Sequence, residues 1–429
     1  MGGGCLNKVA KFGGSSLADA VQFRKVAAIV KGDPDRRVII VSACGKSVVE
    51  REKVTDLLYR LYACIQGDRG YEEIWESIVN RYVTIRDELG MVCDIESELV
   101  GIYNRLEKDV SVEWLVSRGE YLCSLLMAEY LGYSFIDATK VLFFHEDGIL
   151  DREKSKYALG KILEDHCGIV IPGFYGAFPN GEIHTLGRGG SDVSGSMIAD
   201  LMEAELYENW SDVSGIFMVD PRIIPEAVKC SHISYQKVRE LSHLGANILH
   251  EDTIFPLLSR NISLVIRNTN APQDPGTLVT AQEIDPCEIC GITGKKGYSL
   301  LRVYKEELSI ENDWLLTIAN TLRELPVSIE YIRNSIDHYT IVFKEVECID
   351  TLLSSLPDNY EHIHSLAILG IVGNTLEPRR IERALASLHD SEIEVYYSSQ
   401  DPHTSTCIFL VNDRQLEDAI RILYYAFLG

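Results

Sequence analysis

Near the start of the chain stands the stretch Val9-Ala10-Lys11-Phe12-Gly13-Gly14-Ser15-Ser16. Its apolar first half is typical of a short strand, and a helix is expected to follow at Val21 to Val30. Adjacent glycines let the backbone approach a phosphate closely, and the helix end adds positive potential. Lys11, at the end of the strand, can neutralise charge on a phosphoryl group. The stretch predicts a phosphate site in an α/β fold; the alternative is a glycine turn beside a surface lysine.

Roughly the first 285 residues alternate apolar, strand-like runs with amphipathic stretches, which predicts an α/β domain with a mainly parallel sheet. Residues 70–110 are charged and helix-periodic, so we expect an added helical subdomain there. Pro179-Asn180-Gly181 predicts a hairpin, because Asn-Gly suits a tight primed turn. The clearest strands and helices are expected at Val38–Val41, Gly168–Ile171 and Leu264–Ile266, and at Val54–Ile65 and Val112–Leu131.

The composition turns to loop residues at Asn268–Gly276, and Pro286 follows. We therefore expect the first domain to cover residues 1–285. Beyond it, a strand, a helix at Asn312–Leu325, two strands and a further helix are expected, and the same order starts again at Leu366–Val372. This order is the ferredoxin-like layout, repeated. It predicts one small domain at 286–365 and a second at 366–429, the latter completed by a strand from 287–296.

A second glycine-rich motif is Gly187-Arg188-Gly189-Gly190-Ser191-Asp192, between a strand and a helix. Ser191 is a favourable N-cap and Asp192 suits a first helical turn. Capping does not account for three glycines beside an arginine, which favours a ligand close to the backbone. A third motif runs from Ser211 to Arg222, where Asp212 can accept hydrogen bonds from a nucleotide and Arg222 can pair with phosphates.

The bulk composition restricts the class of function. The chain has 429 residues with 41 Lys and Arg against 64 Asp and Glu, a net charge of −23. That balance opposes nucleic-acid or anionic-membrane binding, since both need a cationic face. No apolar run is long enough to span a membrane, and the N-terminus lacks a secretory h-region. Eleven scattered cysteines favour reduced thiols and a cytoplasmic protein. Cys287 and Cys290 form a single C-x-x-C, and without a second such motif this is weak support for a metal or redox role.

Together the motifs resemble the aspartate kinase family of the amino-acid kinase superfamily. The shared patterns are K-F-G-G-S-S at Lys11–Ser16, G-R-G-G-S-D at Gly187–Asp192, and S-D-V-x-G with D-P-R at Ser211–Arg222. Lys53–Leu58, Ser117–Glu120 (the family's S-x-G-E) and Leu241–His250 agree as well, and the C-terminal repeat resembles the family's pair of ACT domains. The resemblance implies an amino-acid kinase fold followed by two ferredoxin-like (βαββα) ACT domains.

The resemblance also implies residue roles. Lys11, Gly13, Gly14 and Ser15 would hold the ATP phosphates, and Asp192 would orient Lys11. Aspartate would be held by Thr55, Glu120 and Arg188, with Glu120 on the α-ammonium and Arg188 on a carboxylate. Gly189, Gly190 and Ser191 would line the path of substrate and phosphoryl group. Ser211, Asp212, Phe217 and Arg222 would bind the nucleotide. Phe217 replaces the family's usual Tyr and Asn247 its usual Lys, and the second change removes a cation from the nucleotide side.

The implied reaction converts MgATP and L-aspartate into ADP and 4-phospho-L-aspartate, the first step toward lysine, threonine, methionine and diaminopimelate. Mg²⁺ would be carried mainly on the phosphates. A dimer or larger homo-oligomer formed through the ACT pair would bind lysine as feedback effector, with Leu308, Ser309, Asn334 and Ser335 as contacts. Two alternatives remain open: a related kinase acting on glutamate or acetylglutamate, and an amino-acid-binding regulator whose kinase domain is inactive.

Overall fold

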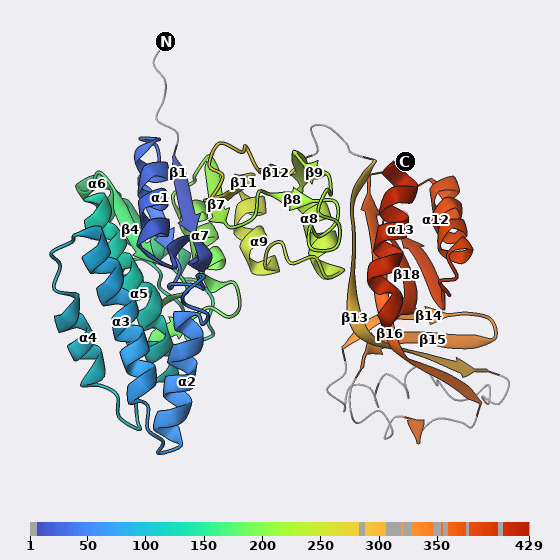
Figure 1. Cartoon of the computed structure of the whole chain (residues 1–429), viewed down its shortest axis with the longest axis horizontal. Coiled ribbons are helices and arrows are strands. Elements are labelled where there is room, and N and C mark those ends of the chain that lie inside the picture. The colour runs from blue at the N-terminus through green and yellow to red at the C-terminus, as the bar shows by residue number, and fades with distance from the viewer. Residues whose placement is uncertain are drawn as a thin grey trace, which may run out of the picture. The chain divides into compact units, whose positions relative to one another are not determined.

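The computed structural model describes residues 7–282, 288–305, 320, 328–345, 353–354, 359–374, 377–401 and 406–428. These form two compact units (Figure 1). The first unit comprises residues 1–216, 229–238 and 248–285. The second comprises residues 217–228, 239–247 and 286–429. Two short segments from the first part of the sequence thus belong to the second unit.

The first unit is built on an eight-stranded sheet with the order β10-β12-β11-β7-β1-β2-β4-β3. All its neighbouring strands pair in parallel except β11 and β12. The sequence prediction of a mainly parallel sheet is therefore confirmed. The strands are β1 (Lys8–Phe12), β2 (Val38–Val41), β3 (Ser134–Phe135), β4 (Ile169–Pro172), β7 (Leu206–Ser211), β10 (His232–Ser234), β11 (Ser263–Asn268) and β12 (Thr277–Thr280).

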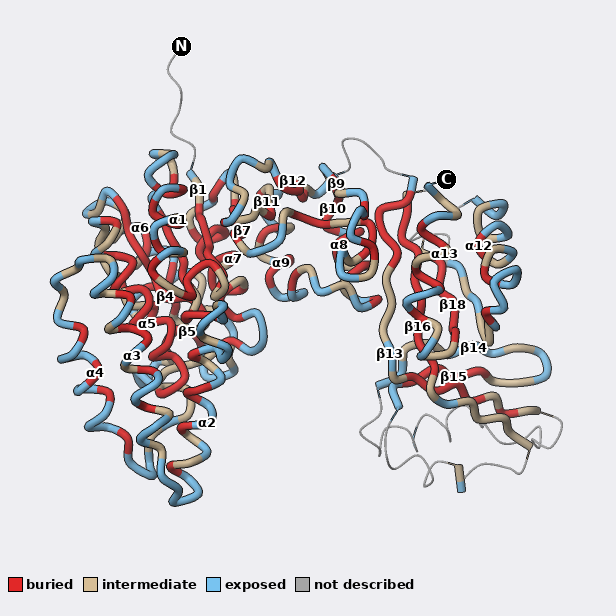
Figure 2. The backbone as a smooth tube through the Cα atoms, in the orientation of Figure 1, coloured by how far each residue is buried: buried red, intermediate tan, exposed pale blue. Residues whose placement is uncertain are grey.

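The central strands are buried on both faces, as Figure 2 shows, so they are continuous apolar runs rather than alternating ones. The helices of this unit are α1 (Ala20–Lys31), α2 (Val54–Gln66), α3 (Glu72–Leu89), α4 (Ile95–Tyr103), α5 (Val112–Leu131), α6 (Arg152–Asp165), α7 (Gly190–Leu201) and α9 (Glu251–Ser259). Short 3₁₀ turns lie at η1 (Gly14–Leu17) and η2 (Ala138–Lys140). The predicted hairpin is confirmed, with β5 (Tyr175–Ala177) pairing antiparallel to β6 (Ile183–Thr185).

The charged stretch 70–110 forms α3 and α4, as its periodicity predicts. Their apolar side chains share one core with those of α1, α2 and α5; Trp75, Ile78 and Tyr82 of α3 pack in the same cluster as Phe23 and Leu57. The stretch is therefore an integral part of the first unit's core. Helix α8 (Tyr235–His243) and the short strands β8 (Ile216–Phe217) and β9 (Lys229–Cys230) complete this part of the sequence.

The second unit contains a six-stranded antiparallel sheet with the order β14-β15-β13-β16-β18-β17. The long strands β13 (Ile289–Tyr304) and β16 (Tyr360–Gly373) pair along most of their length. The later half of β13 also pairs with β15 (His338–Lys344), and the later half of β16 with β18 (Thr406–Asn412). The edge strands are β14 (Ile329–Asn334) and β17 (Tyr397–Asp401). Strands β13 and β16 therefore lie side by side at the centre of the sheet, and each pairs on its other edge with a strand of its own repeat.

This pairing gives two ferredoxin-like strand orders within one sheet. Helices α12 (Pro378–Asp390) and α13 (Leu416–Leu428), with the 3₁₀ turn η3 (Asp413–Gln415), belong to the second repeat. The helix expected at Asn312–Leu325 lies outside the described residues, except for residue 320.

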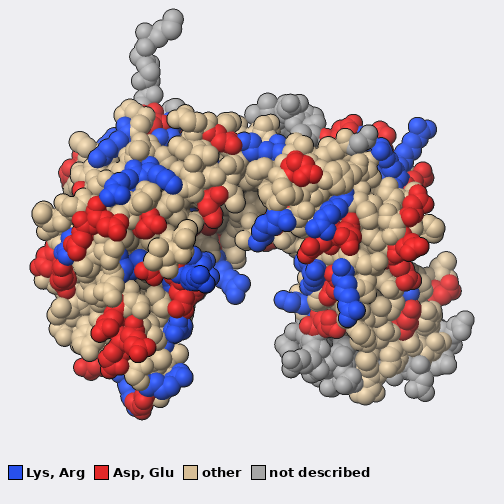
Figure 3. Space-filling view, viewed as in Figure 1, with Lys and Arg blue, Asp and Glu red and all other residues tan. Residues whose placement is uncertain are grey.

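The charge distribution on the surface and the character of the helices can both be compared with what the sequence predicts. On the face drawn in Figure 3, lysine and arginine side chains are interspersed with acidic ones and form no continuous basic surface among the described residues. Within the same residues, none of the helices combines the length and apolar character needed to cross a lipid bilayer.

Candidate active site

The candidate site lies where several strands of the parallel sheet end. Strand β1 leads into Gly13 and Gly14, β2 leads into Ser42, and β7 ends at Ser211, directly before Asp212. Carboxyl ends of parallel strands meet at one edge of a sheet, where α/β folds bind ligands. A cavity of about 450 Å³ opens there, and its lining includes Gly14, Ser15, Gly45, Lys46, Lys53, Thr55, Glu120, Ser191 and Asp212.

A buried ion pair joins two of the predicted catalytic residues. Lys11 is only 6% exposed, and its Nζ lies 2.6 Å from Oδ1 of Asp192. The same carboxylate oxygen accepts a hydrogen bond of 2.9 Å from Nδ2 of Asn209. Asn209 pairs in register with Lys11 across β1 and β7, so both side chains reach Asp192 from neighbouring strands. The sequence prediction did not include Asn209, because only the strand register brings it here.

The glycine turn after β1 is closely packed against the loop after β2. The amide of Gly45 donates to the carbonyl of Gly14 at 2.8 Å, and the amide of Gly13 donates to the carbonyl of Trp210 at 2.9 Å. A Cβ on Gly45 would lie 2.4 Å from the carbonyl carbon of Gly14, and one on Gly14 would lie 2.9 Å from the carbonyl oxygen of Ala43. Both positions therefore require glycine for steric reasons.

Glu120 lies on α5 and is 4% exposed, although its carboxyl group lines the cavity. Burial raises the pKa of Glu120 to about 8, despite the opposing effects of a backbone hydrogen bond from Ala43 and the nearby Arg118 and Lys11. Its Oε2 has no hydrogen-bond partner among the described residues. An unsatisfied buried carboxyl group is costly, so a ligand that supplies a donor or a cation would be stabilised here.

The glycine-rich loop before α7 differs from the sequence prediction in one respect. The helix begins at Gly190 with Gly189 as its N-cap, and Gly189 adopts a left-handed backbone with φ of +72°. The prediction of Ser191 as N-cap is therefore wrong: the left-handed glycine starts the helix two residues earlier. Asp192 lies in the first turn, as predicted.

Phe174, which the sequence prediction missed, supports this loop. A Cβ on Gly190 would lie 2.7 Å from its Cδ2. Phe174 itself has a φ of +77°, which is rare for a bulky residue, and such outliers concentrate at functional sites. Its carbonyl accepts from the amide of Leu186 and its amide donates to Oγ of Ser194, so contacts on both sides hold the strained backbone.

The other predicted ligand contacts in the first unit are more exposed. Thr55 is half-buried and lines the cavity, and so does the exposed Asp212. Ser211 has a half-buried side chain whose Oγ accepts from the amide of Val213 at 3.3 Å. Arg188 is exposed on the loop before α7 and is not part of the cavity lining. The structure thus brings together Thr55, Glu120 and Asp212, but not Arg188.

Phe217 and Arg222 lie on the segment 217–228, which belongs to the second unit. Phe217 is half-buried. The guanidinium of Arg222 is exposed and pairs with Asp220, at 2.5 Å between Nη2 and Oδ2.

Of the predicted effector contacts, Leu308 and Ser309 lie outside the described residues. Asn334 ends strand β14, and Ser335 follows it. Nζ of Lys305 donates to Oδ1 of Asn334 at 2.5 Å and also to the carbonyl of Ser335. A lysine ammonium therefore already contacts both residues.

The loop after β2 supplies cavity residues that the sequence prediction did not assign. Gly45, Lys46 and Lys53 line the cavity beside the predicted Thr55. The available signal was the Gly45-Lys46 pair in the loop that follows the apolar run Val38–Val41, since loops after parallel strands commonly carry ligand contacts.

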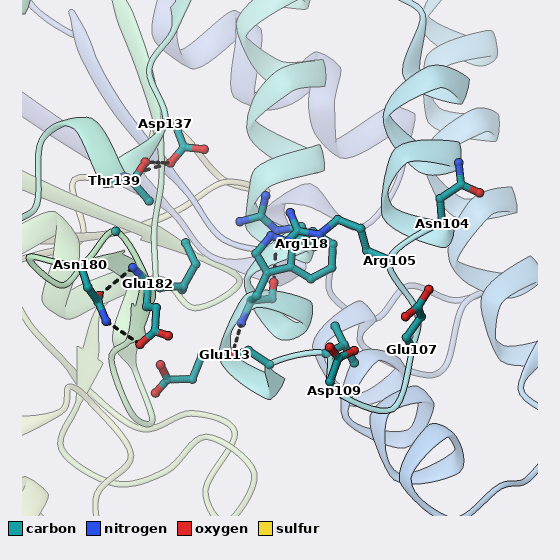
Figure 4. Close-up of a pocket in the computed structure, with 15 residues that line it drawn as sticks. Asn104, Arg105, Glu107, Asp109, Glu113, Arg118, Asp137, Thr139, Asn180 and Glu182 are labelled. Carbon is teal, nitrogen blue, oxygen red and sulfur yellow. Dashed lines mark hydrogen bonds between the residues drawn. The ribbon is translucent and has the colours of Figure 1, made fainter.

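A larger cavity, of about 870 Å³, lies elsewhere in the first unit and is shown in Figure 4. Arg105 and Arg118 lie there against the ring of Trp114, at 4.0 and 5.1 Å from its centroid. None of the predicted site residues lines it. The smaller cavity is the better candidate despite its size, because it holds the buried Glu120 carboxyl group and the glycine turn next to the Lys11–Asp192 pair.

The whole chain is similar to known proteins. The model of the amino acid kinase family matches residues 8–268, more than half of the chain. Aspartokinase 3 of Bacillus subtilis (strain 168) is 29% identical to it over 446 residues, with 98% of both chains covered.

Solved structures of aspartate kinases are similar to the fold described above. The crystal structure of aspartate kinase from Clostridium acetobutylicum is 36% identical in sequence, with a TM-score of 0.88 and coverage of 98% of this chain and 100% of that one. E. coli aspartokinase III, solved with aspartate and ADP and also with lysine and aspartate, gives TM-scores of 0.80 and 0.77 at 22% and 23% identity, covering 98% of this chain and 100% and 99% of those chains. At that identity the E. coli structures support the fold alone.

The raised pKa of Glu120 predicts a specific pH dependence of stability. Between the ordinary value of 4.5 and about 8, folded Glu120 keeps its proton while the unfolded chain has lost it. The free energy of unfolding should therefore fall as the pH rises through this window, by at most about 1.4 kcal/mol per pH unit. Glu120→Gln lacks this titration, so its stability relative to wild type should increase from pH 5 to pH 8. Urea unfolding of the ligand-free protein at several pH values measures this.

Glu76→Gln, an exposed substitution on α3, serves as the control and should show no such trend. A stability difference between Glu120→Gln and wild type that stays constant from pH 5 to pH 8 would show that Glu120 titrates normally.

Proposed function

The chain belongs to the amino acid kinase family and, within it, to the aspartate kinases; on that premise we propose that it phosphorylates the side-chain carboxylate of L-aspartate. ATP is the donor, and the products are ADP and 4-phospho-L-aspartate. The observation that carries the proposal is one cavity lined both by the glycine turn at Gly14 and Ser15 and by the buried Glu120 carboxyl group. The first group suits phosphates and the second suits an ammonium group.

The phosphoryl group would be transferred directly, because the aspartate carboxylate is itself the nucleophile. Catalysis then rests on alignment and on stabilising negative charge. Lys11, held by Asp192 at 2.6 Å, is the preorganised cation of this mechanism. Gly13, Gly14 and Ser15 would direct backbone N–H groups to the phosphates. Gly189, Gly190 and Ser191 would line the path between the two substrates.

Aspartate would be held on the other side of the same cavity. An α-ammonium group placed at Oε2 of Glu120 would supply the missing partner and lower the pKa of that carboxyl group, so Glu120 would bind in its charged form. Thr55 would add a hydrogen bond. Arg188 would reach the substrate from its exposed loop and pair with a carboxylate in bidentate geometry.

The nucleotide is assigned to the residues around the end of β7. Ser211 and Asp212 would accept hydrogen bonds from it. Phe217 and Arg222 are the other residues that we propose for nucleotide binding. Arg222 would have to exchange its pair with Asp220 for a phosphate. Asn247, at the position where the family usually has a lysine, supplies no cation to this side.

Mg²⁺ would enter with ATP. Among the described residues, no group of three or more His, Cys, Asp or Glu side chains is arranged to hold a metal ion. Mg²⁺ often keeps waters and uses substrate phosphates with only one or two carboxylates. Asp192 and Asp212 are the carboxylates at this edge that suit such a role. When bound, the ion would neutralise charge on the phosphates.

The second unit would be regulatory. E. coli aspartokinase III has been solved with lysine as well as aspartate, and its fold is similar. We place the effector at Asn334 and Ser335, together with Leu308 and Ser309, and propose lysine as an inhibitor acting in a homodimer or larger oligomer. Nζ of Lys305 already contacts both oxygens, so they can accept from an ammonium group, and an effector ammonium would have to displace it. A cytoplasmic location, where ATP is available, is part of the proposal.

A coupled assay of ADP release tests the reaction and its alternatives. With aspartate as acceptor we expect MgATP-dependent turnover, and with glutamate or acetylglutamate much slower turnover. Preference for glutamate would assign the chain to a related reaction. Absence of turnover with all three, in protein that binds lysine, would favour a regulator with an inactive kinase domain.

Arg188→Lys should raise the KM for aspartate far more than the KM for ATP. A planar guanidinium binds a carboxylate through two parallel hydrogen bonds, which the point charge of lysine does not reproduce. Steady-state kinetics with each substrate varied in turn measures both constants. Arg188 is exposed, so the variant should fold like the wild type. An increase confined to the KM for ATP would move Arg188 to the nucleotide site.

Lysine should inhibit more strongly than threonine or methionine, and the effect should require the second unit. Equilibrium dialysis with labelled lysine measures the binding step, and the coupled assay measures its consequence. Asn334→Ala should weaken binding without changing the uninhibited rate. If millimolar lysine neither binds saturably nor changes the activity, the antiparallel sheet has no lysine site.

A further inference from the structure

Helix α3 belongs to the charged stretch 70–110, for which the sequence suggested no function. Two consecutive residues in its middle, Arg81 and Tyr82, are almost fully buried. The hydroxyl of Tyr82 donates to the carbonyl of Gly119 at 2.8 Å, the residue directly before Glu120. Arg81 extends instead to the loop after β2. One turn of α3 thus contacts both α5, which carries Glu120, and the loop after β2, which lines the candidate cavity.

Arg81 binds residues along a loop that we define as the 45–53 loop. Its Nη1 donates to the carbonyl of Gly45 at 2.8 Å. Its Nη2 donates to the carboxylate of Glu50 at 2.8 Å and to the carbonyl of Glu52 at 3.3 Å. A single guanidinium therefore fixes the beginning and the end of the loop.

The loop has little else to hold it. A turn closes between Ser47 and Glu50, whose backbone groups bond at 2.8 Å, but this contact is internal. Another side-chain contact from outside, between Arg60 and Glu52, is half-exposed and therefore weak. The tip residues Val48 and Val49 are 96% and 85% exposed, so they add no packing. Apart from the backbone bond between Gly45 and Gly14 at the start of the loop, Arg81 supplies its buried attachment among the described residues.

The position of this loop matters because it lines the cavity. Gly45, Lys46 and Lys53 all face it, and Thr55 follows directly at the start of α2. Gly45 also packs against Gly14, but the backbone at Gly13 is held separately by its bond to Trp210. A displaced loop would therefore disturb the side of the cavity near Thr55 and Glu120 more than the glycine turn.

We propose that Arg81 is a positioning residue, which holds the 45–53 loop in the conformation that binds aspartate. The proposal rests on the proposed function, since the aspartate side of the cavity is defined there. Arg81 touches neither substrate; it acts through Gly45, Glu50 and Glu52. Lysine cannot replace it, because one ammonium group does not reach three acceptors in the fork geometry of a guanidinium.

Kinetics of three variants test the proposal. Arg81→Met should raise the KM for aspartate by about tenfold or more, since misplacement by about 1 Å can cost ~10²-fold in rate. Glu50→Gln weakens the same attachment from the half-exposed loop side and should give a smaller increase in a protein that folds normally. The KM for ATP should change by less in both. Arg86→Gln is the matched control, because Arg86 lies on the same helix but pairs with Asp87 and Glu96.

Limited digestion with trypsin gives a readout independent of activity. The loop contains Lys46, Arg51 and Lys53, and cleavage there can be identified by mass spectrometry. Arg81→Met and Glu50→Gln should be cut faster at these sites than wild type or Arg86→Gln. Unchanged cleavage and an unchanged KM for aspartate would overturn the proposal, and so would an equal KM increase in Arg86→Gln.

Different results would refute the proposed function and the positioning role of Arg81. A wild-type protein without aspartate-dependent turnover would refute the proposed function, while trypsin would still report whether Arg81 holds the loop. An active wild type, whose Arg81 and Glu50 variants keep the wild-type KM for aspartate and cleavage pattern, would refute the positioning role alone.

Discussion

The ion pair between Lys11 and Asp192 is the contact on which the site depends. It joins the end of β1 to the first turn of α7 at 2.6 Å, with Lys11 buried and Asp192 half-buried. A buried lysine without a partner would be costly, so the pair requires that strand, helix and the glycine-rich loop before the helix stay in register. Asn209 adds a third element, because β7 presents it to the same carboxylate. The cation is thereby fixed before any substrate binds, as electrostatic catalysis requires.

Close backbone approach is the second constraint. Gly14 and Gly45 come from the ends of neighbouring strands and approach so closely that neither has room for a Cβ. This contact joins the glycine turn to the loop after β2, and Gly119 lets α5 approach Ala43, which brings Glu120 to the same cavity. Phosphate-binding and ammonium-binding groups therefore face one space. Helix α3 supports both walls from behind through Arg81 and Tyr82.

Strands and turns could be predicted from the sequence wherever a local pattern of residues determines the structure. Val38–Val41 is an apolar run because a central parallel strand is buried on both faces, and the Asn180-Gly181 turn was predicted from its own chemistry. Contacts between distant segments were not predictable in this way. Nothing near Arg81 indicates that it meets Gly45, 36 residues away. The start of α7 was misplaced because Ser191 is a good N-cap by type, whereas the left-handed Gly189 decides the start in the folded chain.

The central claim is that Lys11 is the preorganised cation for phosphoryl transfer to aspartate. Its most direct measurement is kcat of purified Lys11→Ala at saturating MgATP and aspartate, after circular dichroism and unfolding have shown that the variant is folded. Lys8→Ala, on the same strand but paired with Asp33, is the control and should keep wild-type kcat. For Lys11→Ala, kcat should fall by about 10²–10³, the usual cost of removing one preorganised group from a transition state. Retention of more than about a tenth of the wild-type kcat would contradict the account.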